Sequence, residues 1–457
     1  MQNTQFKNLS LTKDMLENLK RLGYANMTPI QEQSLPLSLN GEDIIAQAQT
    51  GSGKTVAFSL VLLNKLRIEK FRIQSIVLAP TRELANQIAG EMKKLAKFAH
   101  NIKITTLCGG VPYKPQVHSL SHQAHIIIGT PGRILKHLQE DTFDPADINT
   151  LVLDEADRML DMGFNEDINK IIDFLPKERQ TLLFSATYPS NIQTLSKNIM
   201  NNPAQIQIES THQKDSIEEL FYESEISSKK NTICNLLTTY KPQSTIIFCN
   251  TKIACDELAE DLEDDGIETL VLHSDLEQRD RSETIILFAN KSYPVLIATD
   301  VASRGLDIDD IDLVINYSLP FDAEVYTHRI GRTARAGKKG RAVSLIDSSD
   351  LENFGDMNEE NNFKLLQATT LSEDRTYKAT SPFKTLFINS GKKNKMRAGD
   401  ILGALTAGIG LQKDDIGKID ILEFASYVAV KVNVAKKAHD ELQNSRIKGK
   451  YFKIYMM

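Results

Sequence analysis

The sequence predicts two tandem α/β domains, each built on a parallel sheet, followed by a small ferredoxin-like α+β domain. Short apolar runs alternate with helical patterns over the first two hundred residues, and a similar alternation restarts after Asn202-Pro203. Near-continuous apolar strands separated by helices are typical of a parallel sheet with both faces buried. From residue 384 the order becomes strand, helix, strand, strand, helix, strand, which is the ferredoxin-like plan.

Each domain has its own set of predicted strands. Those of the first domain are Asp43–Ala46, Ser75–Leu78, Ile102–Thr105, His125–Ile128, Leu151–Leu153 and Thr181–Phe184. Those of the second are Ser244–Phe248, Glu268–Leu272, Val295–Ala298, Leu313–Asn316 and Arg341–Leu345. The third has strands Thr385–Asn389, Ile416–Glu423, Ser426–Asn433 and Tyr451–Tyr455, with helices Ala398–Ala407 and Val434–Asn444. We therefore expect domains at 1–205, 206–365 and 384–457, with a linker at 366–383.

The composition predicts a cytoplasmic enzyme. The 457 residues are 41% hydrophobic and 25% charged, which is ordinary for a globular protein, and no apolar run approaches membrane-spanning length. The N-terminus lacks the basic-then-apolar pattern of a secretion signal. The four cysteines have no metal-ligand spacing and are expected to be reduced thiols.

The charge is unevenly distributed along the chain. Residues 384–457 contain 14 Lys/Arg and 7 Asp/Glu, a local charge of +7, so the other 383 residues carry −13 of the total of −6. A basic domain on an acidic body is typical of a nucleic-acid-binding appendage. Charge alone leaves open a solvated, lysine-rich surface.

The segment Ala48–Thr55 is Ala-Gln-Thr-Gly-Ser-Gly-Lys-Thr, between the strand pattern Asp43–Ala46 and the helical pattern Val56–Leu66. Strand, glycine-rich turn and helix in this order predict a phosphate-binding loop. Glycines let successive backbone N–H groups face phosphate oxygens, and the helix N-terminus adds partial positive charge. We expect Lys54 to reach the β- and γ-phosphates and the Thr55 hydroxyl to hold Mg²⁺.

The tetrapeptide Asp154-Glu155-Ala156-Asp157 follows the apolar pattern Leu151–Leu153. Ligands of open α/β sheets bind at the carboxyl ends of the strands. A carboxylate there can hold Mg²⁺ opposite the phosphate loop, and its neighbour can orient the attacking water. Asp154 is therefore a predicted metal ligand and Glu155 a predicted catalytic residue. By itself the tetrapeptide also fits a helix N-terminus with dipole-favoured acids.

With these motifs the chain resembles the DEAD-box ATP-dependent RNA helicases, whose name is spelled by Asp154–Asp157. The motifs span roughly residues 6 to 337. The resemblance implies two RecA-like domains, with ATP and Mg²⁺ as cofactors and RNA as partner. The nucleotide contacts that it implies are Phe6, Gln31, Gln49, Thr50, Gly51, Ser52, Gly53, Lys54, Thr55, Asp154, Gly305 and Asp307.

Two of these residues belong to a segment, Gly23–Gln31 with the preceding aromatic, that resembles the family's adenine-recognition motif. The Gln31 amide can pair with the adenine edge, and Phe6 offers a stacking face. An ordinary core contact is the alternative for Phe6. In the family the tripeptide matched by Ser185-Ala186-Thr187 couples nucleotide state to strand separation, although a simple helix cap is the alternative.

Further motifs resemble the residues with which the family contacts RNA. Such contacts hold an RNA strand in place without reading its base sequence. These motifs lie in loops that follow predicted strands of both domains. The RNA-binding residues they imply are Pro80, Thr81, Arg82, Gly110, Thr130, Pro131, Gly132, Arg133, Gln278, Arg281 and Thr299.

The segment His328–Gly337 matches the family's arginine motif, with Ala334 where the family usually has glycine. Arg332 and Arg335 are three residues apart, and we expect them to project from one face of a helix. As arginine fingers they can stabilise charge on the γ-phosphate once the two domains close. Lys54, Glu155, Arg332 and Arg335 are therefore the predicted catalytic set.

In the third domain, the segments Thr385–Asp400, Asp415–Ile419 and Arg446–Lys450 resemble the C-terminal domain of the DbpA-type bacterial subgroup. The resemblance covers nearly the whole domain and implies a 23S rRNA hairpin near the peptidyl-transferase centre as target. The strand Ser426–Val430 of this domain lacks the aromatic pattern of an ordinary RNA-recognition strand. We therefore expect phosphate contacts from basic residues instead, with solubilising surface lysines as the alternative. These residues are Lys392, Lys393, Lys395, Arg397, Lys448 and Lys450.

The sequence thus predicts an RNA-stimulated ATPase that locally unwinds or remodels 23S rRNA in pre-50S ribosomal particles. It is expected to act away from membranes, as a monomer or weak dimer. An ATP-gated RNA clamp or assembly scaffold remains open, because clamping and unwinding share one closed state. A DNA motor is disfavoured by the tetrapeptide and by the C-terminal domain.

Overall fold

The computed structural model describes residues 5–49, 51–208, 216–300, 311–320, 322–334, 339–358, 363–374 and 377–457. The chain forms two compact units, the first containing one sheet and the second containing two. No helix in the described part of the chain has both the length and the apolar character that a membrane crossing requires.

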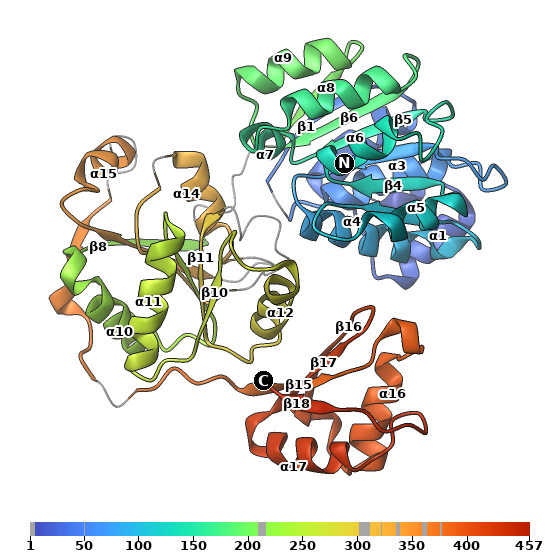
Figure 1. The fold of residues 1–457 in the computed structure, drawn as a ribbon. Coiled ribbons are helices and arrows are strands. Elements are labelled where there is room, and N and C mark those ends of the chain that lie inside the picture. Colours follow the sequence, from blue (N-terminus) through green and yellow to red (C-terminus); the bar gives the residue numbers. More distant parts are fainter. Residues whose placement is uncertain are drawn as a thin grey trace. The chain divides into compact units, whose positions relative to one another are not determined.

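The first unit is a seven-stranded, all-parallel sheet in the order β3-β4-β2-β5-β6-β1-β7 (Figure 1). Its strands are β1 (Ile44–Gln47), β2 (Ser75–Leu78), β3 (Ile104–Leu107), β4 (Ile126–Gly129), β5 (Thr150–Asp154), β6 (Gln180–Ser185) and β7 (Ala204–Gln207). Its helices are α1 (Lys13–Arg21), α2 (Pro29–Leu39), α3 (Lys54–Lys65), α4 (Arg82–Leu95), α5 (Tyr113–Ser121), α6 (Pro131–Gln139), α7 (Ala156–Asp161), α8 (Asn165–Phe174) and α9 (Ser190–Ile199).

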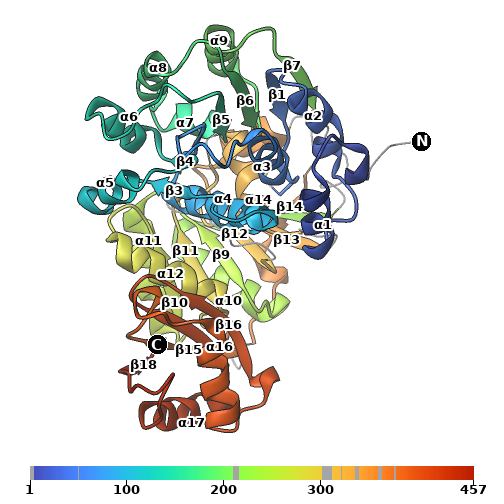
Figure 2. The same cartoon turned by 90° about the vertical axis from the view of Figure 1, so that its right-hand side faces the viewer.

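Both faces of this sheet are buried, as the continuous apolar strands predict. Side chains that alternate along one strand belong to different cores: Ile44 packs with α1–α4, whereas Ile45 packs with α6–α9 (Figures 1 and 2). All seven strands run in one direction, so their carboxyl ends lie at one edge of the sheet. The loops of the predicted motifs follow these ends.

The second unit begins with another seven-stranded parallel sheet, in the order β10-β11-β9-β12-β13-β8-β14. Its strands are β8 (Ile217–Glu223), β9 (Thr245–Phe248), β10 (Thr269–Leu272), β11 (Val295–Ala298), β12 (Leu313–Asn316), β13 (Gly340–Ile346) and β14 (Leu365–Gln367). The helices described are α10 (Lys229–Tyr240), α11 (Lys252–Asp264), α12 (Gln278–Ala289), α14 (Ala323–Ile330) and α15 (Leu351–Asn358). The prediction of two parallel-sheet domains is confirmed.

The C-terminal sheet is antiparallel, in the order β16-β17-β15-β18. It contains β15 (Phe383–Ile388), β16 (Ile416–Ile421), β17 (Ser426–Lys431) and β18 (Ile454–Met456), with α16 (Ala398–Gly403) and α17 (Val432–Gln443). Both helices pack on one face of the sheet, against Leu386 and Val428 (Figure 1). This is the predicted ferredoxin-like domain.

Some predicted boundaries were wrong. Helix α3 begins at Lys54 and not at Val56, because Gly53 has a φ of 96° and ends the loop there. Helix α16 is shorter than predicted, since a wider helical turn replaces its last residues from Ala404. The edge strands β7 and β14, and β8 between β13 and β14, were not predicted at all. β7 has one buried residue, Ile206, and so lacks the apolar run of the inner strands.

Candidate active site and RNA-binding surface

The phosphate loop joins β1 to α3. Gly51 and Gly53 have φ values of 83° and 96°, which an L side chain rarely adopts. A Cβ on Gly53 would also lie 2.5 Å from Gln31 Nε2. Lys54 is buried, and its Nζ donates to the Ala48 carbonyl oxygen at 2.7 Å. The backbone and the lysine therefore have the local form that phosphate binding needs.

Gln31 connects the phosphate loop to the start of α2. Its Nε2 donates to the Gly53 carbonyl at 3.0 Å, and its Oε1 accepts from the Thr28 backbone N–H at 3.0 Å. Phe6 lies in the core of the first sheet, 4% exposed, with its ring edge-on to Tyr24. Gln31 thus supports the loop from α2, Phe6 packs in the core, and the predicted adenine contacts of both residues stay predictions.

The acidic tetrapeptide begins at the last residue of β5. Asp154 is 3% exposed, and burial raises the pKa of its carboxyl group to about 7, although the charge of Lys54 opposes the shift. Glu155 follows with a φ of 53° and forms an ion pair with buried Arg158, at 3.2 Å between Oε2 and Nη1. Two carboxylates with different surroundings therefore stand next to the phosphate loop, which fits a division into metal ligand and water-orienting base.

Asp157 joins the tetrapeptide to the segment after β6. Its Oδ2 accepts from the backbone N–H groups of Ala186 and Thr187, both at 3.0 Å, and from the Thr187 hydroxyl at 3.1 Å. The Ser185 hydroxyl accepts from the Asp157 N–H at 3.3 Å. Burial opposes ionisation, but Lys54 and these hydrogen bonds keep the pKa of Asp157 below its ordinary value. The predicted coupling residues Ser185 and Thr187 thus contact this carboxylate directly.

The donor set fits a magnesium nucleotide rather than a free metal ion. Within the described residues, no group of three His, Cys, Asp or Glu side chains could hold a metal. Mg²⁺ prefers one or two protein oxygens together with phosphate oxygens and water. The Asp154 carboxyl lies near Lys54 of the phosphate loop, and a cation beside it would offset the cost of ionising Asp154.

The predicted RNA residues of the first domain follow β2, β3 and β4, three adjacent strands. Thr81 and Thr130 precede α4 and α6, and their hydroxyls accept from Leu84 N and Gly109 N at 3.2 and 3.4 Å. Pro80 lies in the loop after β2 and Gly110 in the loop after β3, whereas Pro131 and Gly132 begin α6. The predicted nucleotide-binding residues follow β1, β5 and β6. The RNA-binding and nucleotide-binding residues therefore lie along different parts of the edge formed by the carboxyl ends of the strands.

Both arginines of this RNA set are oriented by the loop that follows β3. Arg82 Nη1 donates to the Gly110 carbonyl at 3.5 Å, and Arg133 Nη2 donates to the Val111 carbonyl at 3.1 Å. Gln116 adds a second acceptor for Arg133, at 3.2 Å, and its own Nε2 donates to the Cys108 carbonyl. Sequence analysis missed Gln116, because a glutamine within a helix gives no signal of this role.

In the second sheet, Arg329 holds together the ends of three strands. Its guanidinium forms a bidentate ion pair with Asp300, with both hydrogen bonds at 2.7 Å, and donates to Asn250 Oδ1 at 2.8 Å. It also donates to Asn316 Oδ1 and to the Ser318 carbonyl, at 3.2 and 2.8 Å. Arg329 is 1% exposed, and its role is therefore structural: it connects the ends of these strands.

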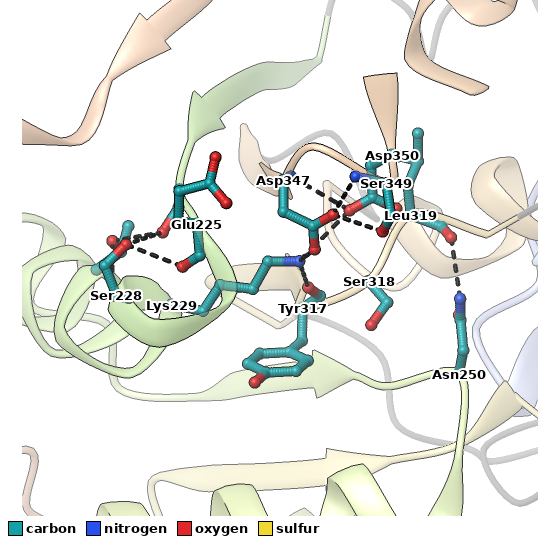
Figure 3. Close-up of polar contacts among 12 residues, drawn as sticks. Glu225, Ser228, Lys229, Asn250, Tyr317, Ser318, Leu319, Asp347, Ser349 and Asp350 are labelled. Carbon is teal, nitrogen blue, oxygen red and sulfur yellow. Dashed lines mark hydrogen bonds and ion pairs between the residues drawn. The ribbon is translucent and has the colours of Figure 1, made fainter. Parts of the chain in front are cut away.

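Three successive carbonyl groups after β12 are each held by a different side chain. Figure 3 shows two of these contacts, from Lys229 to Tyr317 and from Asn250 to Leu319. Lys229 Nζ donates to the Tyr317 carbonyl at 2.8 Å, Arg329 to that of Ser318 and Asn250 to that of Leu319 at 3.1 Å. This segment leads into α14, which carries Arg329 and precedes Arg332. No sequence pattern indicated this role for Lys229 or Asn250.

Arg332 corrects one prediction. Helix α14 ends at Ile330, so Arg332 lies in the turn that follows it and not on a helix. It is 5% exposed, and its carbonyl accepts from Ile311 N at 3.4 Å. Ala334, where the family usually has glycine, has a φ of 57°. The helix ends in a tighter turn, in which the N–H groups of Arg332 and Thr333 donate to the carbonyls of Arg329 and Ile330.

The other predicted second-domain residues lie at strand and helix ends. Thr299 directly follows β11, and its backbone N–H donates to the Leu272 carbonyl at 3.2 Å. Gln278 and Arg281 lie in the first turn of α12. Four predicted site residues fall outside the described part of the chain: Thr50, Gly305, Asp307 and Arg335.

The C-terminal basic residues gather from two loops, and all six are exposed. Lys448 Nζ donates to the Lys395 carbonyl at 3.0 Å and lies 3.7 Å from an Asp400 oxygen. Buried Met396 and Ile447 anchor the two loops in the core beside them. We call Lys392, Lys393, Lys395, Arg397, Lys448 and Lys450 the basic cluster.

Comparison with known families places three models along the chain. A DEAD/DEAH box helicase model matches residues 28–195, a helicase conserved C-terminal domain model matches 228–337, and a DbpA RNA binding domain model matches 385–455. The three matches lie in the first parallel-sheet domain, the second parallel-sheet domain and the C-terminal domain, respectively.

Relatives and solved structures agree with these matches. ATP-dependent RNA helicase DbpA of Escherichia coli is 48% identical, over 99% of this chain and 100% of its own length. The protein of the same name from Bacillus subtilis is 35% identical, over 99% of both chains. Among solved structures, S. cerevisiae Dbp5 bound to RNA and ADP BeF3 is 32% identical, with a TM-score of 0.72, over 80% of this chain and 95% of that one.

Proposed function

The chain belongs to the DbpA-type DEAD-box ATP-dependent RNA helicases, and on that premise we propose that it remodels 23S rRNA during large-subunit assembly in the cytoplasm. Membership makes it an RNA-dependent ATPase and RNA helicase. The observation that carries the choice of RNA is the basic cluster, which lies in a domain that matches the DbpA RNA binding domain.

Hydrolysis is assigned to residues at the edge of the first sheet. Loop N–H groups and Lys54 bind the phosphates, and Glu155, held by Arg158, orients the attacking water. Mg²⁺, held by Thr55 and Asp154, would neutralise charge on the phosphate oxygens. Arg332 and Arg335 supply positive charge to the γ-phosphate in the ATP-bound, RNA-bound state.

RNA is assigned to two surfaces with different tasks. The loops after β2, β3 and β4, together with Gln278, Arg281 and Thr299, bind the backbone of a strand without base specificity. The basic cluster binds a hairpin of 23S rRNA near the peptidyl-transferase centre and keeps the enzyme on pre-50S particles. Seven lysine and arginine charges in excess on this domain support phosphate binding there.

The test compares ATPase stimulation of the full chain by 23S rRNA, 16S rRNA and an unrelated RNA. We expect 23S rRNA to stimulate at the lowest concentration, and the double variant Lys448→Ala/Lys450→Ala to lose that preference. Removing two phosphate contacts should also reduce the salt dependence of binding by about two counterions. Equal stimulation of the unmodified enzyme by all three RNAs would refute the proposed target.

The matched control is Lys436→Ala/Lys437→Ala, which removes two exposed lysines of the same domain from helix α17. We expect this variant to retain the preference for 23S rRNA. If both pairs weaken binding equally, the domain acts through its net charge and the basic cluster is not a site.

A further inference from the structure

A buried histidine lies behind the proposed RNA contacts of the first domain. His137 of α6 is fully buried, and its Nε2 lies 3.1 Å from Oε1 of Gln116, which is itself buried. The same oxygen accepts from Arg133 Nη1 at 3.2 Å, and the Gln116 amide nitrogen donates to the Cys108 carbonyl at 2.9 Å. Arg133 is therefore connected to His137 through one buried side chain.

The partners of Gln116 determine which nitrogen of His137 carries a proton. A guanidinium always donates and a carbonyl always accepts, so Oε1 of Gln116 faces Arg133 and its amide nitrogen faces Cys108. An amide oxygen has no proton to give, and His137 Nε2 is therefore the donor to it. Burial and the charge of Arg133 lower the pKa of His137 to about 4, so the ring is neutral near pH 7 and carries its one proton on Nε2.

The other ring nitrogen and one face of the imidazole also have contacts. The Thr142 hydroxyl lies 2.8 Å from Nδ1 of His137 and 3.1 Å from its carbonyl oxygen, so its proton can serve either acceptor. The Tyr113 ring stacks on the imidazole, with ring centres 4.4 Å apart and 29° between the planes. Arg133 Cζ lies 5.6 Å from the centre of the same tyrosine ring. The orientation of the imidazole is thus restricted on several sides, and Arg133 packs on the ring that covers it.

These contacts orient Arg133 and leave it able to bind a phosphate. Its bonds to Gln116 Oε1 and to the Val111 carbonyl use two of the five N–H groups of the guanidinium. A bidentate contact with a phosphate needs two more. Because the two bonds restrict a long side chain before RNA binds, less conformational entropy is lost when it does.

We propose that His137, acting through Gln116, is a positioning residue for the RNA contact of Arg133, because its Nε2–H keeps the Gln116 oxygen facing the guanidinium. This role rests on the proposed function of Arg133, and it adds a residue that is too deeply buried to touch RNA itself. Without the histidine donor, the Gln116 amide is held only by the arginine that it is meant to orient and by the Cys108 carbonyl.

Two amide substitutions separate this role from simple filling of space. The terminal amide nitrogen of His137→Gln takes the place of Nε2 and keeps the donor, whereas the shorter amide of His137→Asn lies near the place of Nδ1 and loses it. The measurement is the concentration of unrelated single-stranded RNA that half-maximally stimulates ATP hydrolysis by the full chain.

We expect His137→Asn to raise this RNA concentration about 3- to 10-fold, as for the loss of one hydrogen bond, and His137→Gln to leave it nearly unchanged. The kcat at saturating RNA and the affinity for an ATP analogue without RNA should stay the same in both variants. Equal effects of the two substitutions would overturn the proposal, because the position of the donor would then not matter.

A double-mutant cycle with Arg133→Ala tests whether His137 acts through the arginine. Arg133→Ala removes one charged phosphate contact, so it should weaken RNA binding about tenfold and lower the salt dependence of binding by about 0.7. Adding His137→Asn to Arg133→Ala should weaken binding no further, since the residue to be positioned is gone. Additive losses would show that His137 acts independently of Arg133 and would also overturn the proposal.

His125 provides the matched control. It is also fully buried in the first domain and makes two hydrogen bonds, with Lys103 N and with the Ile68 carbonyl, at 3.1 and 3.0 Å. His125→Asn should lower thermal stability without changing the RNA concentration for half-maximal stimulation. A rise as large as that of His137→Asn would assign the effect to general weakening of the domain, against the proposal.

The single variants also distinguish the positioning role from the proposed function beneath it. If Arg133→Ala alone leaves the RNA concentration for half-maximal stimulation unchanged, Arg133 does not contact RNA, and both proposals fail. If Arg133→Ala raises that concentration and His137→Asn does not, the RNA contact of Arg133 stands and only the role of His137 is refuted.

Discussion

Ionisation of the Asp154 carboxyl group costs free energy in the nucleotide-free enzyme. Its carboxyl group is 3% exposed, and burial raises its pKa to about 7, well above the ordinary value of about 3.9. Because the pKa of Asp154 is higher in the folded protein than in the unfolded chain, the protonated carboxyl group favours the folded state. This contribution to the free energy of unfolding is complete below the unfolded pKa of the carboxyl group and is lost as the pH rises through about 7. A cation that binds the carboxylate would reverse this balance, so metal binding must release a proton.

We therefore predict that Mg²⁺-nucleotide binding becomes tighter as the pH rises from about 6 to 8. Below the pKa the affinity should increase up to about tenfold per pH unit, because the carboxyl group must first lose its proton. Calorimetric titration with a non-hydrolysable ATP analogue, in buffers of different ionisation enthalpy, measures the protons released.

Asp154→Asn is the matched variant, since it keeps the shape of the side chain and removes the titration. It should bind Mg²⁺-nucleotide more weakly and release fewer protons. An unchanged proton release in this variant would assign the linkage to another group.

At the scale of elements, the segment after β12 depends on one buried lysine. Lys229 is 2% exposed, forms an ion pair with Asp347 at 2.7 Å and lies 3.4 Å from Asp350 (Figure 3). Burial opposes ionisation of Asp347, but hydrogen bonds from Lys229 and Ser349 lower its pKa to about 2. Its contribution to stability is therefore present above the unfolded pKa of about 3.9 and is lost as the pH falls toward 2.

We predict that Lys229→Met destabilises the second parallel-sheet domain by about 3–5 kcal/mol, because it leaves two buried carboxyl groups without their cation. The measurement is native-state hydrogen exchange on peptides covering β12 and β13, which reports the free energy of local opening. The Tyr317 carbonyl also loses its donor, so RNA-stimulated hydrolysis should fall with it.

The neighbouring residue supplies the control. Lys230 forms surface ion pairs with Asp261 and Asp265, at 3.7 and 3.3 Å. Lys230→Met should cost less than about 1 kcal/mol. Equal effects of the two substitutions would contradict a special role for the buried lysine.

The same segment shows why only part of the site could be predicted from the sequence. Phosphate loop and acidic tetrapeptide are contiguous and follow apolar strands, so a strand-end pattern was enough to find Lys54 and Asp154. Lys229 contacts Tyr317 and Asp350, which are 88 and 121 residues away along the chain. No local pattern records such a contact. Likewise β14 was missed because its three residues, Leu365–Gln367, are too few to form a periodic pattern.

Helix ends were the other source of error. The spacing of Arg332 and Arg335 fits a helix, but α14 ends at Ile330. Gly331 N donates to the Thr327 carbonyl as the last helical bond, and Ala334, three residues later, has a left-handed backbone conformation. The backbone conformation determines that turn, and an alanine in the sequence does not indicate a left-handed conformation.

At the scale of the whole molecule, we propose that the ATP site takes residues from both parallel sheets. The phosphate loop and Glu155 belong to the first, and Arg332 belongs to the second. If RNA also binds residues of both sheets, ATP and RNA each favour the conformation that binds the other ligand. Linkage then requires the two effects to be equal.

We predict that an ATP analogue increases RNA affinity by the same factor by which RNA increases analogue affinity, about 5- to 150-fold. Glu155→Gln allows the same measurement with ATP itself, because hydrolysis should be abolished while the phosphate loop is intact. Arg332→Ala should keep analogue binding without RNA and lose the coupling, since its guanidinium acts from the second sheet. Fluorescence titrations of each ligand at saturating concentrations of the other measure both factors. Coupling that survives Arg332→Ala would show that RNA assembles the ATP site without this arginine.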